Sequence, residues 1–373
     1  MTADWEMVAI GDLCDVVNGG TPKTGVCEYW DGPHLWITPA EMGKRASPYI
    51  DQTKRTITDQ GLQNSSARLL PPFSVILSSR APIGHLVINT ESMATNQGCK
   101  GLVPSSRVDC KFLYYYLESI VDYLDSLGTG TTFKELSGGR LKEVLVPVPP
   151  IREQRRIVAI LDKTFDDIAN AKVNAQKNLQ NAEDLISSYI RARMYENTKR
   201  WNQKNFEECI DDVRYTAKIK RKNFLDEGVY PIVSQENGLI NGYWNKKNDV
   251  FQVKSPIIIF GDHTKILKYV DFDFVLGADG VKILAPKSFL FPKFFFYYLR
   301  SMPIESLGYA RHFRILKQRN IFFPEKKEQM AIADLIDDME VEAKSLCRLL
   351  ELRIAALDEL KRSILHKAFT GQL

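Results

Sequence analysis

One segment of this chain occurs twice, about 175 residues apart, and each copy joins a mixed segment to a long helical pattern. The first copy, Val148-Pro149-Pro150-Ile151-Arg152-Glu153-Gln154, returns as Phe323-Pro324-Glu325-Lys326-Lys327-Glu328-Gln329. Upstream, Phe112-Leu113-Tyr114-Tyr115-Tyr116-Leu117 corresponds to Phe294-Phe295-Phe296-Tyr297-Tyr298-Leu299. A repeat of this kind predicts two structural units built on one frame. Between the repeated segments the units differ in sequence and length, as expected of a duplicated domain whose copies bind different things.

The repeat divides the chain into four segments. We predict a first domain over 1–148, a helix over 149–198, a second domain over 199–323 and a second helix over 324–373. Both domains contain short apolar runs bounded by turn residues, such as Ser74-Val75-Ile76-Leu77-Ser78 and Pro256-Ile257-Ile258-Ile259-Phe260-Gly261. Runs of this length and punctuation are typical of strands. The expected fold class is therefore α+β, with two mostly β domains separated by two long helices.

Both helical segments carry apolar residues at alternating steps of four and three, the pattern of a coiled coil. One polar residue, Lys172 or Arg353, interrupts each seam. We expect the helices to pair antiparallel with each other, with pseudo-twofold symmetry and a domain at each end, because this buries both seams within one chain. Two ordinary amphipathic helices, each packed on its own domain, remain the alternative. The residues predicted to pair the helices are Leu161, Phe165, Ile168, Leu179, Ile186, Ile336, Met339, Leu346, Leu350, Leu357 and Ile364.

Several loops combine amide, hydroxyl and cationic side chains, which are the groups that contact base edges and phosphates. Arginine and lysine can bind guanine, whereas asparagine and glutamine can pair with adenine. In the first domain the predicted DNA-binding residues are Lys23, Ser79, Arg80, Gln97, Lys100, Thr131, Thr132, Lys134 and Arg140. In the second domain they are Gln235, Asn237, Asp262, His263, Lys265, Lys282, Arg311, His312, Arg314 and Lys317. The basic run Lys218-Ile219-Lys220-Arg221-Lys222 is either a phosphate contact or a solvated loop.

Charge is distributed unevenly along the chain. Residues 1–148 carry 13 Lys and Arg against 16 Asp and Glu, whereas residues 199–323 carry 21 against 13. The second domain therefore has the net positive charge that a polyanion attracts, and the first would need a local basic patch.

Motifs for catalysis are missing from the sequence. It contains no phosphate-binding loop, dinucleotide fingerprint or nucleophile elbow, and its five histidines lack metal-ligand spacing. We expect a non-enzymatic chain without cofactor or metal. We also expect a cytoplasmic protein, because no run approaches the ~18 apolar residues of a membrane span and the N-terminus is unlike a signal peptide.

The ordered set of motifs resembles the specificity subunits (HsdS) of type I restriction-modification enzymes, over essentially the whole chain. The motifs are Trp5 to Asp12, Gly19-Gly20-Thr21-Pro22, Thr38-Pro39-Ala40-Glu41-Met42, Leu69-Leu70-Pro71-Pro72, Ser78-Ser79-Arg80-Ala81-Pro82-Ile83-Gly84, Asn96-Gln97-Gly98, both proline joins and Ala368-Phe369-Thr370-Gly371-Gln372-Leu373. The second domain departs from this pattern: it has no Gly-Gly-Thr-Pro turn, and Asp262-His263 replaces Ser79-Arg80.

The resemblance implies two target recognition domains, each of which reads one half of a bipartite double-stranded DNA sequence. It implies that the helices set the gap and dock two modification subunits, which use S-adenosylmethionine, and that restriction subunits with ATP and Mg²⁺ join them. Because the equivalent loops differ, the target should be asymmetric. A coiled-coil interaction scaffold without DNA specificity, and an enzyme with its own nuclease or methyltransferase activity, are the competing hypotheses.

Overall fold

The computed structural model describes residues 5–43, 45, 47–130, 134–195, 198–277, 280–304 and 311–373. The chain forms two compact units, Met1–Asn174 with Arg353–Leu373, and Ala175–Leu352. Two long helices, α7 (Ile151–Tyr195) and α10 (Lys326–Phe369), each contribute one part to either unit. The α+β prediction with two long helices is confirmed.

The first unit contains a five-stranded sheet of order β2-β9-β6-β7-β4, a three-stranded sheet of order β5-β3-β8 and the ladder β1-β10. Its strands are β1 (Glu6–Ala9), β2 (Cys14–Asn18), β3 (Trp30–Ile37), β4 (Tyr49–Ile50), β5 (Arg55–Ile57), β6 (Val75–Ser79), β7 (Ile83–Asn89), β8 (Met93–Thr95), β9 (Cys99–Pro104) and β10 (Leu145–Val148). Its short helices are α1 (Ile10–Leu13), α2 (Pro39–Met42), α3 (Asp59–Gln63), α4 (Cys110–Ser119), α5 (Val121–Ser126) and α6 (Gly138–Lys142), with a 3₁₀ turn η1 (Cys27–Tyr29).

The second unit repeats this plan. Its sheets have the orders β12-β20-β17-β18 and β13-β19-β14-β15, with β16 paired to β19, and its ladder is β11-β21. The strands are β11 (Asn202–Asn205), β12 (Ile210–Asp211), β13 (Lys218–Ile219), β14 (Tyr230–Val233), β15 (Gly242–Trp244), β16 (Val250–Phe251), β17 (Ile257–Gly261), β18 (Leu267–Val270), β19 (Phe274–Gly277), β20 (Val281–Pro286) and β21 (Asn320–Phe323). The helices are α8 (Pro292–Ser301) and α9 (Phe313–Lys317), with 3₁₀ turns η2 (Thr198–Arg200), η3 (Phe206–Cys209), η4 (Arg221–Asn223) and η5 (Lys247–Asp249).

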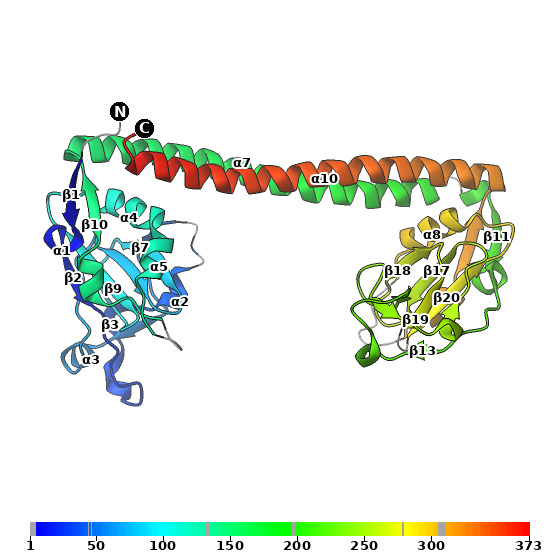
Figure 1. Cartoon of the computed structure of the whole chain (residues 1–373), viewed down its shortest axis with the longest axis horizontal. Helices are drawn as coiled ribbons and strands as arrows, with labels where there is room; N and C mark the ends of the chain where they lie inside the picture. Colours follow the sequence, from blue (N-terminus) through cyan, green and yellow to red (C-terminus); the bar gives the residue numbers. More distant parts are fainter. Residues whose placement is uncertain are drawn as a thin grey trace. The chain divides into compact units, whose positions relative to one another are not determined.

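The central strand of each unit is buried on both faces, which explains its uninterrupted apolar sequence. In β6, Val75 and Leu77 pack with α4 and α7, whereas Ile76 packs with the second sheet. Successive side chains of a strand point to opposite faces, so a strand between two layers must be apolar throughout. In β17, Ile258 packs toward α8 and α10 and Ile259 toward the second sheet. Within each unit a short helix, α4 or α8, lies between the sheets and the long helices (Figure 1).

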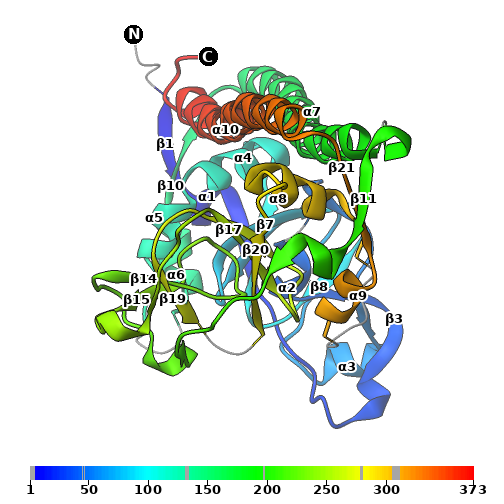
Figure 2. The same cartoon turned by 90° about the vertical axis from the view of Figure 1, so that its right-hand side faces the viewer.

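A two-stranded ladder connects each domain to the long helices. β1 pairs antiparallel with β10, which leads into α7, and β11 pairs antiparallel with β21, which leads into α10. Figure 2 shows both ladders running up to the helices. The repeated proline joins lie directly after β10 and β21, where the chain passes from strand to helix.

The helix seam of α7 follows the predicted steps. Leu161, Ile168, Ala175 and Ala182 are all less than a tenth exposed, and Phe165, Leu179 and Ile186 are half-buried. In the first unit, α7 and the end of α10 pair antiparallel: Arg156 donates to the carbonyl of Leu373 (2.9 Å), while further along α7 the Lys172 ammonium contacts Asp358.

The seam of α10 agrees with the prediction at every predicted pairing residue except Leu346. Ile336 and Leu350 are buried, and Met339, Leu357 and Ile364 are half-buried. Leu346, however, is 48% exposed, and Cys347 is the less exposed neighbour. Arg353 is also exposed, with Ile354 in the half-buried place. This corrects the predicted helix-pairing role of Leu346. The error arose because apolar residues follow two overlapping patterns one residue apart, and one residue is a rotation of about 100°.

Candidate nucleic-acid interface

A buried glutamine fastens the first domain to α7. Gln154 has no exposed surface. Its Nε2 donates to the carbonyl oxygens of Arg107 (3.0 Å) and Pro149 (2.8 Å), and its Oε1 accepts from the backbone N–H of Asp109 (2.8 Å). One amide side chain thus satisfies three backbone groups at the place where the end of β9, α4 and α7 meet.

Gln329 makes the same three bonds in the second unit. Its Nε2 donates to Phe289 (2.9 Å) and Pro324 (2.8 Å), and its Oε1 accepts from the N–H of Phe291 (2.7 Å). It is also fully buried. The glutamine of the repeated Glu-Gln dipeptide therefore encodes a domain-to-helix connection.

An aspartate on each long helix binds the short aromatic helix that packs against it. Asp162 accepts from the Tyr115 hydroxyl (2.5 Å) and from the Lys111 ammonium (2.8 Å). In the second unit the Tyr297 hydroxyl donates to Asp337, and Lys293 lies 2.8 Å from the same carboxylate. Burial and the bond to the carboxylate raise the pKa of both tyrosines. The duplicated aromatic segment thus positions the domain on its helix, a role that the sequence analysis had not assigned.

Three predicted contact residues of the first unit, Ser79, Arg80 and Lys100, gather where β6 ends and β9 begins. Arg80 Nη1 lies 4.0 Å from a carboxylate oxygen of Glu135, and Lys100 Nζ lies 3.7 Å from the other. Arg80 is half-buried, whereas Lys100 is only 6% exposed and Ser79 is fully buried. In this arrangement Arg80 is the accessible cation of the group.

The equivalent group in the second unit lies where β17 ends. Asp262 is 3% exposed, and its carboxylate accepts from the N–H of Phe313 (2.8 Å) at the start of α9. His312 is fully buried, and its backbone N–H donates to the carbonyl of Asp262 (2.8 Å). The Lys282 ammonium lies 5.4 Å from the centre of the Phe313 ring.

Ser79 and Asp262 hold equivalent backbone positions. The N–H of Ser79 donates to Gly98 (2.8 Å), and that of Asp262 donates to Gly280 (2.7 Å). The carbonyl of Ser79 accepts from the N–H of Leu136 (2.9 Å), just before α6. That of Asp262 accepts from the N–H of His312 (2.8 Å), just before α9. The shared frame therefore places one loop cluster in each unit. The first cluster has Arg80 and Lys100 beside Glu135, and the second has the buried Asp262 and His312.

The other predicted contact residues lie outside these two clusters or at their edges. Lys134 pairs with Asp125 (2.6 Å), and Arg140 donates to the carbonyl of Leu127 (2.9 Å). Thr131 and Thr132 lie outside the described residues. The exposed members are Lys23, Gln97, Lys134, Arg140, Asn237, Arg311, Arg314 and Lys317. None of these geometries tests contact with DNA, so the DNA-binding assignments stay predictions.

The loop that joins β14 to β15 contains residues that were not predicted from the sequence. Gln235 and Asn237 were predicted contact residues, whereas Asn241, which organises the loop, and the apolar residues at its tip were not. Gln235 connects this loop to the second cluster: its Oε1 accepts from the N–H of His263 (3.2 Å) and its carbonyl accepts from Thr264 (2.7 Å). The Asn237-Gly238 dipeptide, a common hairpin signal, could have drawn attention to it.

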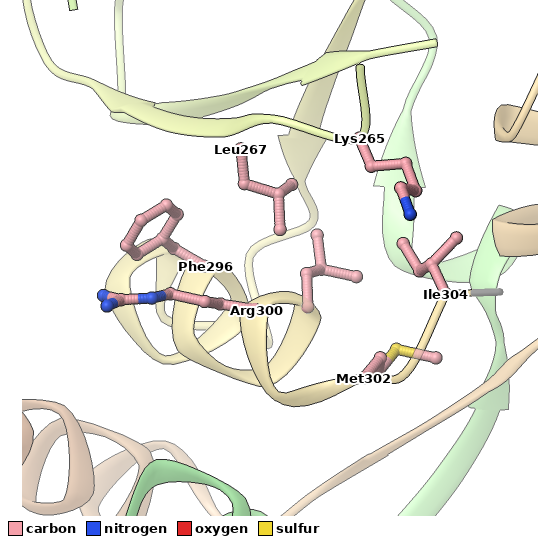
Figure 3. A pocket seen from close by; sticks show the side chains of 7 residues that line it. Lys265, Leu267, Phe296, Arg300, Met302 and Ile304 are labelled. Atoms are coloured by element: carbon pink, nitrogen blue, oxygen red, sulfur yellow. The ribbon is translucent and has the colours of Figure 1, made fainter. Parts of the chain in front are cut away.

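A shallow pocket of about 450 Å³ lies beside the second cluster. Leu267, Phe296 and Met302 form part of its lining, and Lys265 and Arg300 bring cations to it (Figure 3). Arg300 is paired with Glu340. The predicted contact residue Lys265 therefore lies at the edge of an apolar pocket.

Among the described residues, no group of three or more His, Cys, Asp or Glu side chains could hold a metal ion. Within the same residues, no helix has the length and apolar character needed to cross a membrane.

Three comparisons place these observations beside known proteins. A model of the type I restriction modification DNA specificity domain matches residues 2–180 and 198–346. The specificity subunit of type I restriction enzyme MjaIX from Methanocaldococcus jannaschii is 36% identical over 179 residues, covering 48% of this chain and 41% of that protein. The EcoR124I/EcoR124II specificity subunit from Escherichia coli is 29% identical over 199 residues, covering 49% of this chain and 48% of that protein. In these matches the chain spans about half the length of the curated relatives.

A solved structure described as the "Structural basis underlying complex assembly and conformational transition of the type I R-M system" resembles the whole chain. The TM-score is 0.81 at 17% identity, with 100% of both chains covered. At that identity the similarity establishes a shared fold.

Proposed function

The chain belongs to the type I restriction modification DNA specificity family, and on that premise we propose that it is a non-catalytic subunit that directs modification and restriction subunits to a bipartite, asymmetric DNA target. Each unit reads one half of the target. S-adenosylmethionine, ATP and Mg²⁺ belong to the partner subunits in this proposal, and the complex works in the cytoplasm on double-stranded DNA.

The observation that carries this proposal is the pair of equivalent loop clusters with different chemistry. Ser79 and Asp262 make the same two backbone bonds. Around them, however, Arg80 in one unit and His263 in the other offer different hydrogen-bonding groups. Because base edges are distinguished by donor and acceptor patterns, equivalent loops with different side chains favour two different half-sites.

Exposed leucines on α10 support docking of a modification subunit. Leu346, Leu349 and Leu352 are 48%, 65% and 61% exposed, although all three lie on a helix whose other face is buried. Clustered exposed apolar side chains on one element are typical of protein interfaces. Because Leu346 is exposed, it is better placed to dock a partner subunit than to pair α10 with α7.

The decisive experiment sequences DNA for methylated adenine in cells that express this chain with a cognate modification subunit. Cells with the modification subunit alone serve as the control. A bipartite asymmetric motif that requires both proteins is the expected result. A palindromic motif would contradict the asymmetric target, and a motif that does not require this chain would contradict its specificity role.

The dependence of DNA affinity on salt concentration distinguishes this proposal from the scaffold hypothesis. If loop lysines and arginines neutralise phosphates, the logarithm of DNA affinity falls linearly with the logarithm of salt concentration. The net charge of −3 over residues 1–148 is the feature that favours a protein-binding scaffold for the first domain. A complex that assembles with its partner but binds the target duplex no better than other DNA would support the scaffold instead.

A further inference from the structure

The hairpin loop of residues 234–241, between β14 and β15, is held by one buried network of side chains. The Oδ1 of Asn241 accepts from the N–H and hydroxyl of Ser234 (both 2.9 Å) and from the Lys268 ammonium (2.8 Å). Its Nδ2 donates to the carbonyl of Asn237 (2.7 Å). Gly238 follows with φ +83°, a conformation that suits glycine. The loop is therefore built to hold one shape.

This rigid loop presents two apolar side chains to solvent. Leu239 and Ile240 are 44% and 43% exposed, and they stand next to each other at the tip. Because these two side chains bury little apolar area in the free protein, they contribute little to its stability, and adjacent exposed apolar side chains are typical of a contact surface. The corresponding turn after β3 in the first unit is different: Met42 is only 3% exposed, and Thr38 and Glu41 form a capping box.

Cationic residues lie at the same end of the sheet as this tip. Lys218 in β13 and Val233, the last residue of β14, are both level with Leu276 of β19. The run from Lys218 to Lys222 thus begins where the hairpin leaves the sheet. Within it, Arg221 Nη1 donates to the carbonyl of Asn241 (3.1 Å) and lies 3.1 Å from Glu236.

Amide groups and the predicted contact cluster adjoin the tip as well. Gln235 in the same loop bonds to His263 and Thr264, and Asn237 is exposed. An apolar tip among amides and cations, in a domain with 21 basic against 13 acidic residues, is complementary to DNA, whose grooves offer apolar and hydrogen-bonding groups beneath charged phosphates.

We propose that Leu239 and Ile240 enter a groove of the duplex and contact bases of the half-site read by the second unit. The basic run from Lys218 to Lys222 binds the flanking phosphates. This inference rests on the proposed function. The roles of the tip and of the basic run follow from their position at the same end of the sheet.

The test replaces Leu239 and Ile240 together with serine in the full chain, in complex with its modification subunit. The matched control is Val229→Ser, because Val229 is 71% exposed but precedes β14, at the end of the strand away from the tip. Affinities for the target duplex and for an unrelated duplex are measured at one salt concentration, and the methylated motif is sequenced again. Thermal unfolding checks that each variant is folded, and Ile240→Ala serves as a milder change.

The double variant is expected to bind the target about tenfold more weakly, to bind unrelated DNA unchanged, and to relax base preference in one half of the motif only. Val229→Ser should leave all three readouts unchanged. An unaltered motif and affinity in the double variant would overturn this inference alone. Loss of partner association without loss of DNA affinity would make the tip a protein contact and also overturn it. If the wild-type complex methylates no motif, the proposed function fails, and this inference fails with it.

Discussion

The Lys172 ammonium of α7 lies 2.7 Å from one oxygen and 2.8 Å from the other oxygen of the Asp358 carboxylate on α10. Both side chains are partly exposed, at 32% and 47%. The polar interruption in the α7 seam is therefore matched by an opposite charge on the second helix of the same unit, which fixes the register of the two helices there.

Because this ion pair is partly exposed, we expect only a modest energetic coupling. A double-mutant cycle with Lys172→Met and Asp358→Asn should give about 0.2–1 kcal/mol, less at high salt. Chemical unfolding measures it. A cycle on Gln180 and Asp184, an exposed pair within α7, is the control. Zero coupling between Lys172 and Asp358 at low salt would contradict a stabilising role for this pair.

Removing the buried glutamines should loosen each domain from its helix separately. Gln154→Ala leaves the N–H of Asp109 without its acceptor, at a cost of about 1–3 kcal/mol. Hydrogen exchange should accelerate at Asp109 but not at Phe291, and Gln329→Ala should give the reverse. Gln180→Ala, at an exposed position of α7, is the control. Equal acceleration at both amides would show that the two connections are not independent.

Burial of Lys268 should make the stability of the second unit depend on pH. Burial lowers its pKa to about 8 from 10.5. The unfolded chain therefore binds more protons between these values, and stability rises with pH by up to about 1.4 kcal/mol per unit there. Below pH 8 both states are protonated and this contribution is flat. The difference in unfolding free energy between wild type and Lys268→Met, measured from pH 7 to 9.5, isolates the effect from other titrating groups. A difference independent of pH would contradict it.

Two arginines should report whether the loop clusters read bases. Arg80→Ala and Arg314→Ala are each expected to cost about 1–3 kcal/mol of target affinity and to relax preference at one position, in different halves of the motif. Methylation sequencing and binding to single-base variants of the target check this. A uniform loss across all sequences would identify a phosphate contact instead.

The lengths of the long helices should determine the gap between the half-sites. Inserting four residues, about one helical turn, into both α7 and α10 is expected to lengthen the unread gap and leave both half-sites unchanged. The methylated motif of the variant complex measures this directly. An unchanged gap would contradict a spacer role for the helices.

The seam of α7 could be predicted throughout, whereas Leu346 in the α10 seam was placed wrongly, for a local reason. α7 offers one apolar pattern, so Leu161, Ile168 and Ala182 identify its buried face. α10 carries leucines at 346, 349, 350 and 352, which fit more than one face. Only the packed structure shows that Leu350 is buried whereas Leu346 is exposed.

Burial of polar residues was also beyond prediction. Asp262 and His312 were predicted to contact DNA from loops, but a backbone bond between them and the bond from Phe313 N–H to the Asp262 carboxylate hold both in the interior. Their partners lie about 50 residues apart in the sequence, so no local pattern indicates them.

By itself the sequence determined the duplication, the α+β class and the existence of two long helices, because repeats and helical periods are local patterns that survive without knowledge of the fold. The tertiary structure decided which side chains connect a domain to its helix and which are presented to solvent. Gln154 and Asp162 bind the domain to its helix, whereas Leu239 and Ile240 are presented to solvent. Which side chains are buried and which are exposed depends on contacts between segments that are distant in the sequence. Burial and hydrogen-bond partners are set by the packing of the chain and not by the order of its residues.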